Sequence, residues 1–215
     1  GVQTCALPIF NTTFDETIGK PLARGYQAAT PEPVDRGVTN FFANLDDVLI
    51  GINNLLQGKP GDAASDVGRF AVNSTFGMLG FIDVASSVGL DKHEEDFGQT
   101  LGVWGVGSGP YLVLPFLGPS TVRDTGGFIV DVNIDPVWDI DDPGARNAAL
   151  AVMLIDQRAD LLSATSIVEE AALDQYAFIR NAYLQRREYL VHDGDPPAGE
   201  DDFDPYDAGP PPEVR

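Results

Sequence analysis

A long uncharged run from Phe97 to Val122 constrains this chain more than any other feature. It is long enough for a membrane-spanning helix, which needs roughly 20 apolar residues. It also contains six glycines and three prolines, and proline lacks the backbone N–H that an unbroken helix uses. The run is therefore predicted to divide into a short helix over 97–103, a glycine turn over 105–109, an apolar arm over 111–117 and a new helix start at Pro119.

Irregular apolar backbone of this kind occurs in two settings. At membrane depth it is tolerated only where protein or a water-filled cavity covers it. The other setting is a buried core loop of a soluble domain. Composition alone leaves both open.

Composition limits the classes of partner that the chain can bind. Its 215 residues suit one large domain or two small ones, with room for a sizeable core. A net charge of −20 argues against nucleic acid and against electrostatic docking on anionic lipid headgroups. Any membrane contact would therefore be hydrophobic. The single cysteine excludes an internal disulfide.

The two ends of the chain are set apart from the fold. Residues 1–9 show no signal peptide, and Gln3 fits badly in a lipoprotein acceptor motif around Cys5. They resemble translated sequencing adaptor, so we treat 1–9 as a doubtful segment, a possible sequencing artefact, and expect the natural chain to begin earlier. Residues 195–215 are acidic and rich in proline, and we predict that they are disordered.

Between these ends, apolar periodicity predicts helices. Apolar residues from 34 to 57 recur every three or four positions, and Gly58 suits the end of that helix. Asp62 can cap the next helix. A helical segment over 14–29 should break or restart at Pro21. The region 143–190 is predicted to be helical throughout, as one strut or two helices.

Two acidic segments are predicted to be exposed. Residues 91–96 read as a charged turn. Residues 131–142 carry oxygen ligands at calcium-loop spacing, but Pro136 stands where such a loop needs glycine, and Asp142 where it needs glutamate. We interpret this segment as a solvated acidic loop.

Signals for catalysis are weak. The sequence has neither an HExxH motif nor a GxSxG elbow, and the glycines at 105–109 lack the lysine of a phosphate-binding loop. His93 and His192 each stand beside acidic residues in predicted loops. We predict no enzyme activity, no metal and no cofactor.

Several stretches strongly resemble the MlaA family, also called VacJ. They are GVTNFFANL (37–45), NNLLQGK (53–59), DVGRFAVNSTFGMLGFIDVASSVGL (66–90), EDFGQTLGVWGVGSGPYLVLPFLGPSTVRD (95–124) and YLQRREYLVHDG (183–194). The resemblance covers residues 10–194. This sequence departs from the family pattern at Asp35, where a basic residue is common in the family, and at Val48, where proline is common. The lipidation motif of the family is also absent.

The resemblance implies a fold and a function. The fold is all-α, a ring-shaped bundle of amphipathic helices embedded in the inner leaflet of the outer membrane, on its periplasmic side, around an amphipathic channel. Family members are outer-membrane lipoproteins of a phospholipid transport system. They remove misplaced phospholipids from the outer leaflet and pass them to a periplasmic carrier, which maintains lipid asymmetry.

The resemblance also implies a ligand, partners and site residues. Phospholipid is the transported ligand, and the expected partners are outer-membrane phospholipids, a periplasmic lipid carrier protein and porin trimers. The residues expected on the lipid pathway or in membrane contact are Asn40, Phe41, Phe42, Tyr111, Leu112, Val113, Leu114, Phe116 and Leu117. The alternatives are a soluble periplasmic lipid-binding or scaffold domain and, more weakly, a lipid hydrolase, for which the sequence offers no positioned nucleophile.

Overall fold

The computed structural model describes residues 3–171 and 174–196, which are mostly helical. Its α-helices are α1 (Gln3–Phe14), α2 (Lys20–Ala29), α3 (Glu32–Leu56), α4 (Pro60–Phe76), α5 (Phe97–Val103), α6 (Val122–Ile134), α7 (Pro143–Asp160), α8 (Leu162–Ala171) and α9 (Gln175–Val191). A π-helical turn, η1 (Asp15–Gly19), and two 3₁₀ turns, η2 (Ser86–Val88) and η3 (Pro136–Asp139), interrupt the connections. Strands β1 (Tyr111–Leu114) and β2 (Gly118–Thr121) form an antiparallel hairpin.

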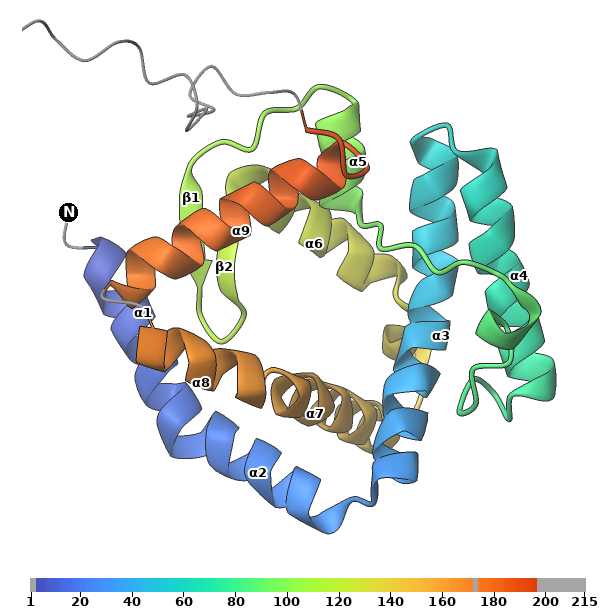
Figure 1. The fold of residues 1–215 in the computed structure, drawn as a ribbon, viewed down its shortest axis with the longest axis horizontal. Coiled ribbons are helices and arrows are strands. Elements are labelled where there is room, and N and C mark those ends of the chain that lie inside the picture. The colour runs from blue at the N-terminus through green and yellow to red at the C-terminus, as the bar shows by residue number, and fades with distance from the viewer. Residues whose placement is uncertain (1–2, 172–173, 197–215) are drawn as a thin grey trace, which may run out of the picture.

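The helices form a closed ring (Figure 1). Helices α1, α2, α3, α6, α7, α8 and α9 surround a central opening, and α4 packs against the outer side of α3. The β-hairpin reaches from the rim toward the middle. The predicted helical ring is thus confirmed, with this hairpin as the β-structure of the described part.

Helix starts follow proline more closely than the sequence analysis expected. Helix α4 begins at Pro60, so the prediction that Asp62 caps it is wrong. Proline suits the first helical position because its missing N–H is not needed there, and Asp62 instead lies in the first turn, where its charge favours the helix dipole. The predicted restart near Pro21 is confirmed, since α2 begins at Lys20.

The uncharged run is divided nearly as predicted. Helix α5 has the expected bounds, and the Asp96 side chain caps it by accepting from the backbone N–H of Gln99 at 2.8 Å. The predicted helix start at Pro119 is wrong, because Pro119 lies in β2 opposite Val113. A two-stranded sheet leaves each strand a free edge, so a missing N–H is tolerated there. Helix α6 starts at Val122 instead.

Three other expectations need correction. The region 143–190 contains three helices, with Leu161 ending α7 and α9 beginning at Gln175. The segment 91–96 is not a turn, and it is only partly exposed. Asp91, Lys92 and Glu94 are exposed as expected, whereas Glu95 is largely buried in an ion pair with Lys59. Residues 131–134 belong to α6 and η3 follows, so 131–142 is not a loop.

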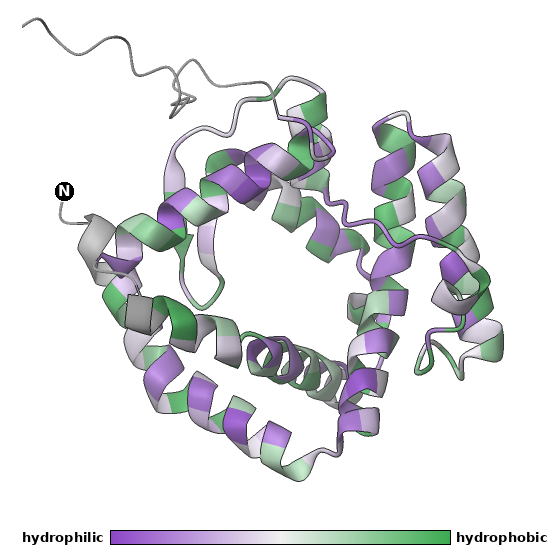
Figure 2. Ribbon diagram, viewed as in Figure 1, coloured by the Kyte–Doolittle hydropathy of each residue, from purple (hydrophilic) through white to green (hydrophobic). Residues whose placement is uncertain are grey.

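Polar and apolar residues are distributed unusually. The largest fully buried side chains are polar: Asn44, Asn53, Asn54, Thr100, Thr121, Asp47 and Asp66. Large apolar side chains are exposed on several elements, including Phe76 at 74% and Ile167 at 66%. Figure 2 shows hydrophobic and hydrophilic residues interleaved along the helices of the ring. Among the described residues, the structure contains no helix with the length and apolar character needed to cross a membrane.

The terminal segments are only partly described. Residues 3–9, set aside in the sequence analysis, lie in α1. The predicted disordered tail, residues 195–215, lies outside the described residues from 197 onward.

Candidate functional site

The β-hairpin is the irregular element inside the ring. Tyr111 pairs with Thr121 and Leu114 pairs with Gly118, which leaves residues 115–117 as a three-residue tip. A three-residue hairpin loop needs a left-handed residue, and here both Phe116 (φ +65°) and Gly118 (φ +84°) adopt that conformation. The left-handed turn leaves Phe116 exposed at the tip.

Helix α1 holds this tip. The Asn11 amide donates to the carbonyl oxygen of Leu114 at 2.8 Å and accepts from the N–H of Phe116 at 3.0 Å. The Phe116 ring meets Phe10 and Phe14 edge to face, with centroids 5.2 and 4.8 Å away. The tip is therefore fixed to α1 by two hydrogen bonds and an aromatic cluster.

Three of the described cavities border the hairpin, and a fourth lies next to one of them. The tyrosine cavity, about 470 Å³, lies between α1, the hairpin, α8 and α9. The apolar cavity, about 660 Å³, lies between α1, η1, α2, the hairpin tip, α7 and α8. The bridging cavity, about 240 Å³, and the acidic cavity, about 520 Å³, lie on the side of α5, α6 and α9, and the acidic cavity also borders α3.

Neighbouring cavities share wall residues. Pro119 lines the first three, and Leu117 at the hairpin tip lines both the apolar and the bridging cavity. Asp96, Asp131 and Arg187 line both the bridging and the acidic cavity. The four cavities thus form one series, with the hairpin tip at its middle.

The apolar end of the series is built from α1, α2 and α7. The walls of the apolar cavity include Phe14, Ile18, Leu22, Leu117, Leu154 and Ile155. The described ion pair in the walls of this cavity joins Arg158 to Asp15 at 2.6 Å. Such a surface suits hydrocarbon chains.

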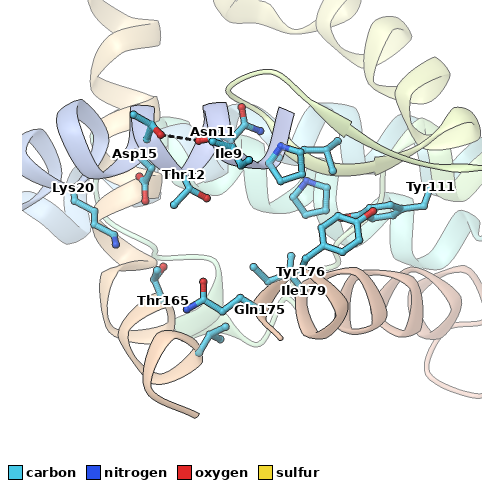
Figure 3. Close-up of a pocket in the computed structure, with 16 residues that line it drawn as sticks. Ile9, Asn11, Thr12, Asp15, Lys20, Tyr111, Thr165, Gln175, Tyr176 and Ile179 are labelled. Atoms are coloured by element: carbon cyan, nitrogen blue, oxygen red, sulfur yellow. Dashed lines mark hydrogen bonds between the residues drawn. The ribbon is translucent and has the colours of Figure 1, made fainter. Parts of the chain in front are cut away.

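The tyrosine cavity has mixed walls (Figure 3). Tyr111 from the hairpin and Tyr176 from α9 lie edge to face at one end, with centroids 6.1 Å apart. Asp15 and Lys20 lie at the other end.

A charged network closes the other side of the hairpin. Arg187 of α9 donates from Nη2 to Oδ1 of Asp96 and to Oδ1 of Asp124, both at 2.9 Å. Tyr183 donates to Oδ2 of Asp124 at 2.8 Å. Burial raises the pKa of Asp96 and of Asp124, but the hydrogen bonds and charge of Arg187 outweigh it, so both pKa values lie below their usual range. Three helices, α5, α6 and α9, are joined by this one guanidinium.

Backbone packing brings α5 and α6 close enough for this network. A Cβ built on Gly127 would lie 2.3 Å from the backbone nitrogen of Gly98, so only glycine fits at this crossing. Asp131, one helical turn further along α6, accepts from the N–H of Phe97 at 3.0 Å. The acidic wall is thus placed by the α5–α6 crossing.

Two carboxylates of the acidic cavity form no described ion pair, although the charge of Lys92 acts on Asp46 and that of Arg187 on Asp131. Asp46 forms no hydrogen bond with a described residue, and Asp131 accepts only from Phe97 and, at 3.5 Å, from Asn53. Burial raises the pKa of Asp131. Burial, reinforced by the charge of Asp135, raises the pKa of Asp46 to about 6.

The structure places the residues named from the sequence in two groups. Tyr111, Val113, Leu114, Phe116 and Leu117 line the described cavities. Leu112 lies on the same strand but lines none of the four, and Asn40, Phe41 and Phe42 lie on α3 outside these four walls. The lipid-pathway role of all nine stays a prediction.

Sequence reasoning missed the polar half of the site. Asn11, Asp46, Tyr183 and Arg187 were not assigned to the site, since each is a common surface type in its own helix. Asp131 was noted only as part of the segment interpreted as a solvated acidic loop. Only Tyr183 and Arg187 stood in a stretch that carried the family resemblance. Their role depends on which helices meet, which spacing within one helix does not report.

The chain is similar to known proteins along nearly its whole length. The family model described as MlaA lipoprotein matches residues 6–190. The intermembrane phospholipid transport system lipoprotein MlaA of Escherichia coli is 35% identical over 184 residues, covering 84% of this chain and 72% of that protein. Its namesake in Haemophilus influenzae is 35% identical over 185 residues, covering 84% and 73%.

A solved structure has the same fold. It is described as the structural basis for maintenance of bacterial outer membrane lipid asymmetry. It superposes with a TM-score of 0.73 at 32% identity, over 86% of this chain and 98% of that one.

Proposed function

This chain belongs to the MlaA lipoprotein family, and we propose that it is the outer-membrane component of a phospholipid transport system. In this role it takes misplaced phospholipids from the outer leaflet and passes them to a periplasmic carrier protein, beside porin trimers. The ring lies in the inner leaflet, on the periplasmic side of the outer membrane. It acts by binding and transfer, without catalysis.

The observation that carries this proposal is the cavity series across the hairpin. Its apolar cavity suits acyl chains, and its bridging and acidic cavities present charged groups that suit a headgroup. A phospholipid has both parts in one molecule. The series therefore matches an amphipathic ligand better than a wholly apolar or wholly polar one.

The outer surface supports a membrane setting. Monomeric soluble proteins rarely expose large contiguous apolar patches. Here Phe76, Met78 and Leu79 are each about 70% exposed within four residues of chain. Such side chains are favourable in contact with lipid and costly in water. This favours an embedded ring over the soluble periplasmic lipid-binding or scaffold domain.

Two measurements test the proposal. Mass spectrometry of the protein purified in detergent should find co-purifying phospholipid, and vesicle flotation should carry the protein with the lipid. Protein that stays soluble without detergent, and does not float, would indicate the soluble alternative. Protein without phospholipid above a mock purification would contradict a lipid-handling role altogether.

A further inference from the structure

The charges that line the acidic cavity do not balance. Its ionisable lining is Asp46, Glu94, Glu95, Asp96, Asp131, Lys92, Arg186 and Arg187, so acids outnumber bases. Each base already has an acidic partner. Lys92 pairs with Asp47 at 2.6 Å, Arg186 with Glu94 at 2.8 Å, and Arg187 with Asp96 and Asp124.

The unbalanced charge belongs to two carboxylates. Glu95 is neutralised by Lys59 at 3.0 Å. Asp46 and Asp131 form no described ion pair of their own, because the nearby Lys92 and Arg187 are paired with other carboxylates, and they lie on α3 and α6 in the cavity wall. Beside them, Gln99 is only 2% exposed and lines the same cavity, and its Oε1 has no hydrogen-bond partner among the described atoms. All three groups offer acceptor oxygens to a ligand that brings donors and positive charge.

This arrangement distinguishes phospholipid headgroups. Every phospholipid carries a phosphate, so contacts to phosphate cannot separate one class from another. A primary ammonium supplies positive charge and three N–H donors, which carboxylates accept strongly. A glycerol headgroup leaves the lipid with a net negative charge, which the two unpaired carboxylates repel.

We propose that Asp46 and Asp131 make the acidic cavity a headgroup filter that favours phospholipids with a primary ammonium, such as phosphatidylethanolamine, over net-anionic ones, such as phosphatidylglycerol. This rests on the proposed function and adds its lipid selectivity. Asp131 also lines the bridging cavity, so the filter extends to the hairpin tip, where the route turns apolar. The acyl chains would then occupy the apolar cavity while the ammonium meets the two carboxylates.

The test compares two lipids in competition. Protein purified in neutral detergent is equilibrated with equal amounts of the two named lipids near neutral pH, and bound lipid is quantified by mass spectrometry. We expect the wild type to enrich the ethanolamine lipid about threefold or more, equivalent to a difference in binding free energy of roughly 0.7 kcal/mol. Asp46→Asn should bring the bound ratio close to that of the mixture. This substitution breaks no described hydrogen bond, so the fold should persist.

The control is Asp141→Asn, which removes the same charge from an exposed side chain outside the four cavities and should keep the wild-type ratio. Asp131→Asn provides a second arm if Asp46→Asn does not fold, since an amide oxygen can still accept from Phe97. Equal binding of both lipids, enrichment of the anionic lipid, or an unchanged ratio in folded Asp46→Asn would overturn the filter while leaving phospholipid transport standing. No bound phospholipid of either class would instead count against the proposed function itself.

Discussion

The side chain of Asn11 donates a hydrogen bond of 2.8 Å to the carbonyl oxygen of Leu114, 103 positions later in the chain. This bond ties the first helix of the ring to the strand that separates its cavities. The hairpin tip lies between the apolar and bridging cavities, so its position decides how the two connect. A helix-to-hairpin bond therefore holds the tip between these two cavities.

Replacing Asn11 with alanine should loosen the hairpin. Two hydrogen bonds are lost, each worth about 1 kcal/mol net. Amide hydrogen exchange over residues 111–121 should rise by about tenfold or more. Asn133→Ala is the control, because its amide bonds only within its own helix, to Ile129. Unchanged exchange in Asn11→Ala would mean that the aromatic cluster alone holds the tip.

Replacing Arg187 with methionine should destabilise the ring strongly. It leaves Asp96 without its cation, while the buried Asp124 keeps only Arg123, at 3.0 Å. The lost hydrogen bonds between charged groups should cost about 1.5–3 kcal/mol. Arg186→Met is the matched control. Its partner Glu94 and Arg186 itself are 65% and 67% exposed, so the loss should stay within about 1 kcal/mol. Chemical denaturation in detergent compares the two, and equal losses would contradict the network.

The same network predicts a pH dependence. Folding lowers the pKa of Asp96 and Asp124. Their contribution to the free energy of unfolding is therefore complete above the usual aspartate pKa, near 4. This contribution should be lost as pH falls below that value, and Arg187→Met should show a weaker acid sensitivity, because Gln99, Tyr183 and Thr121 still donate to the two carboxylates. Melting temperatures of the wild type and the variant, measured across the acidic pH range, test this prediction. An identical pH profile in the variant would show that other groups dominate acid unfolding.

Asp46 should behave in the opposite way. Its pKa is raised to about 6, so its ionised form opposes folding above that pH. The groups that act on it are Lys92, which lowers its pKa, and Asp135 and Asp47, which raise it. Asp46→Asn should therefore stabilise the protein by about 1–2 kcal/mol near neutral pH. The gain should vanish as pH falls toward 4, where aspartate is itself neutral. A destabilised variant near neutral pH would show that the attraction between Asp46 and Lys92 outweighs the cost of burial.

Leu114→Arg should damage function rather than folding. The side chain is half-buried and lines the bridging cavity, where an arginine finds Asp96 and Asp124 nearby. Helix content and abundance should persist, while phospholipid accumulates in the outer leaflet. Val137→Arg is the contrast, since Val137 is 3% exposed and lines none of the four cavities, so a buried charge there should unfold the protein. Wild-type abundance of Leu114→Arg with unchanged lipid asymmetry would remove Leu114 from the route.

Local sequence signals predicted much of this fold. The apolar spacing of α3, the short α5 and the restart at Pro21 were all readable because each depends on residues within a few turns. Gly58, with φ +81°, ends α3 as expected for a residue without Cβ. The split at Leu161 was left open because an apolar stripe can cross a short break.

The remaining elements depend on distant contacts. The segment 91–96 looks like an exposed turn by composition, yet its charges pair with Asp47 of α3, Arg187 of α9 and Lys59 in the α3–α4 connection. Strand β1 has no alternation of apolar and polar residues that would predict a strand. The hairpin depends instead on its tip and on the hydrogen bonds of Asn11. The acidic cavity likewise arises where α3, α5, α6 and α9 meet. No single helix contains a sequence pattern that predicts this cavity.

The central claim is that phospholipid passes the hairpin tip, and Leu117 is the residue to block. Leu117 lines both the apolar and the bridging cavity, so Leu117→Trp adds bulk where the two meet. Leu55→Trp is the control, an exposed leucine outside the four cavities. Transfer of labelled phospholipid from vesicles that contain the protein to its periplasmic carrier protein measures the effect. We predict that Leu117→Trp, folded and embedded as the wild type is, lowers the transfer rate by about tenfold, equivalent to about 1.4 kcal/mol of barrier, while Leu55→Trp does not. An unchanged rate in folded Leu117→Trp would contradict a route through the ring.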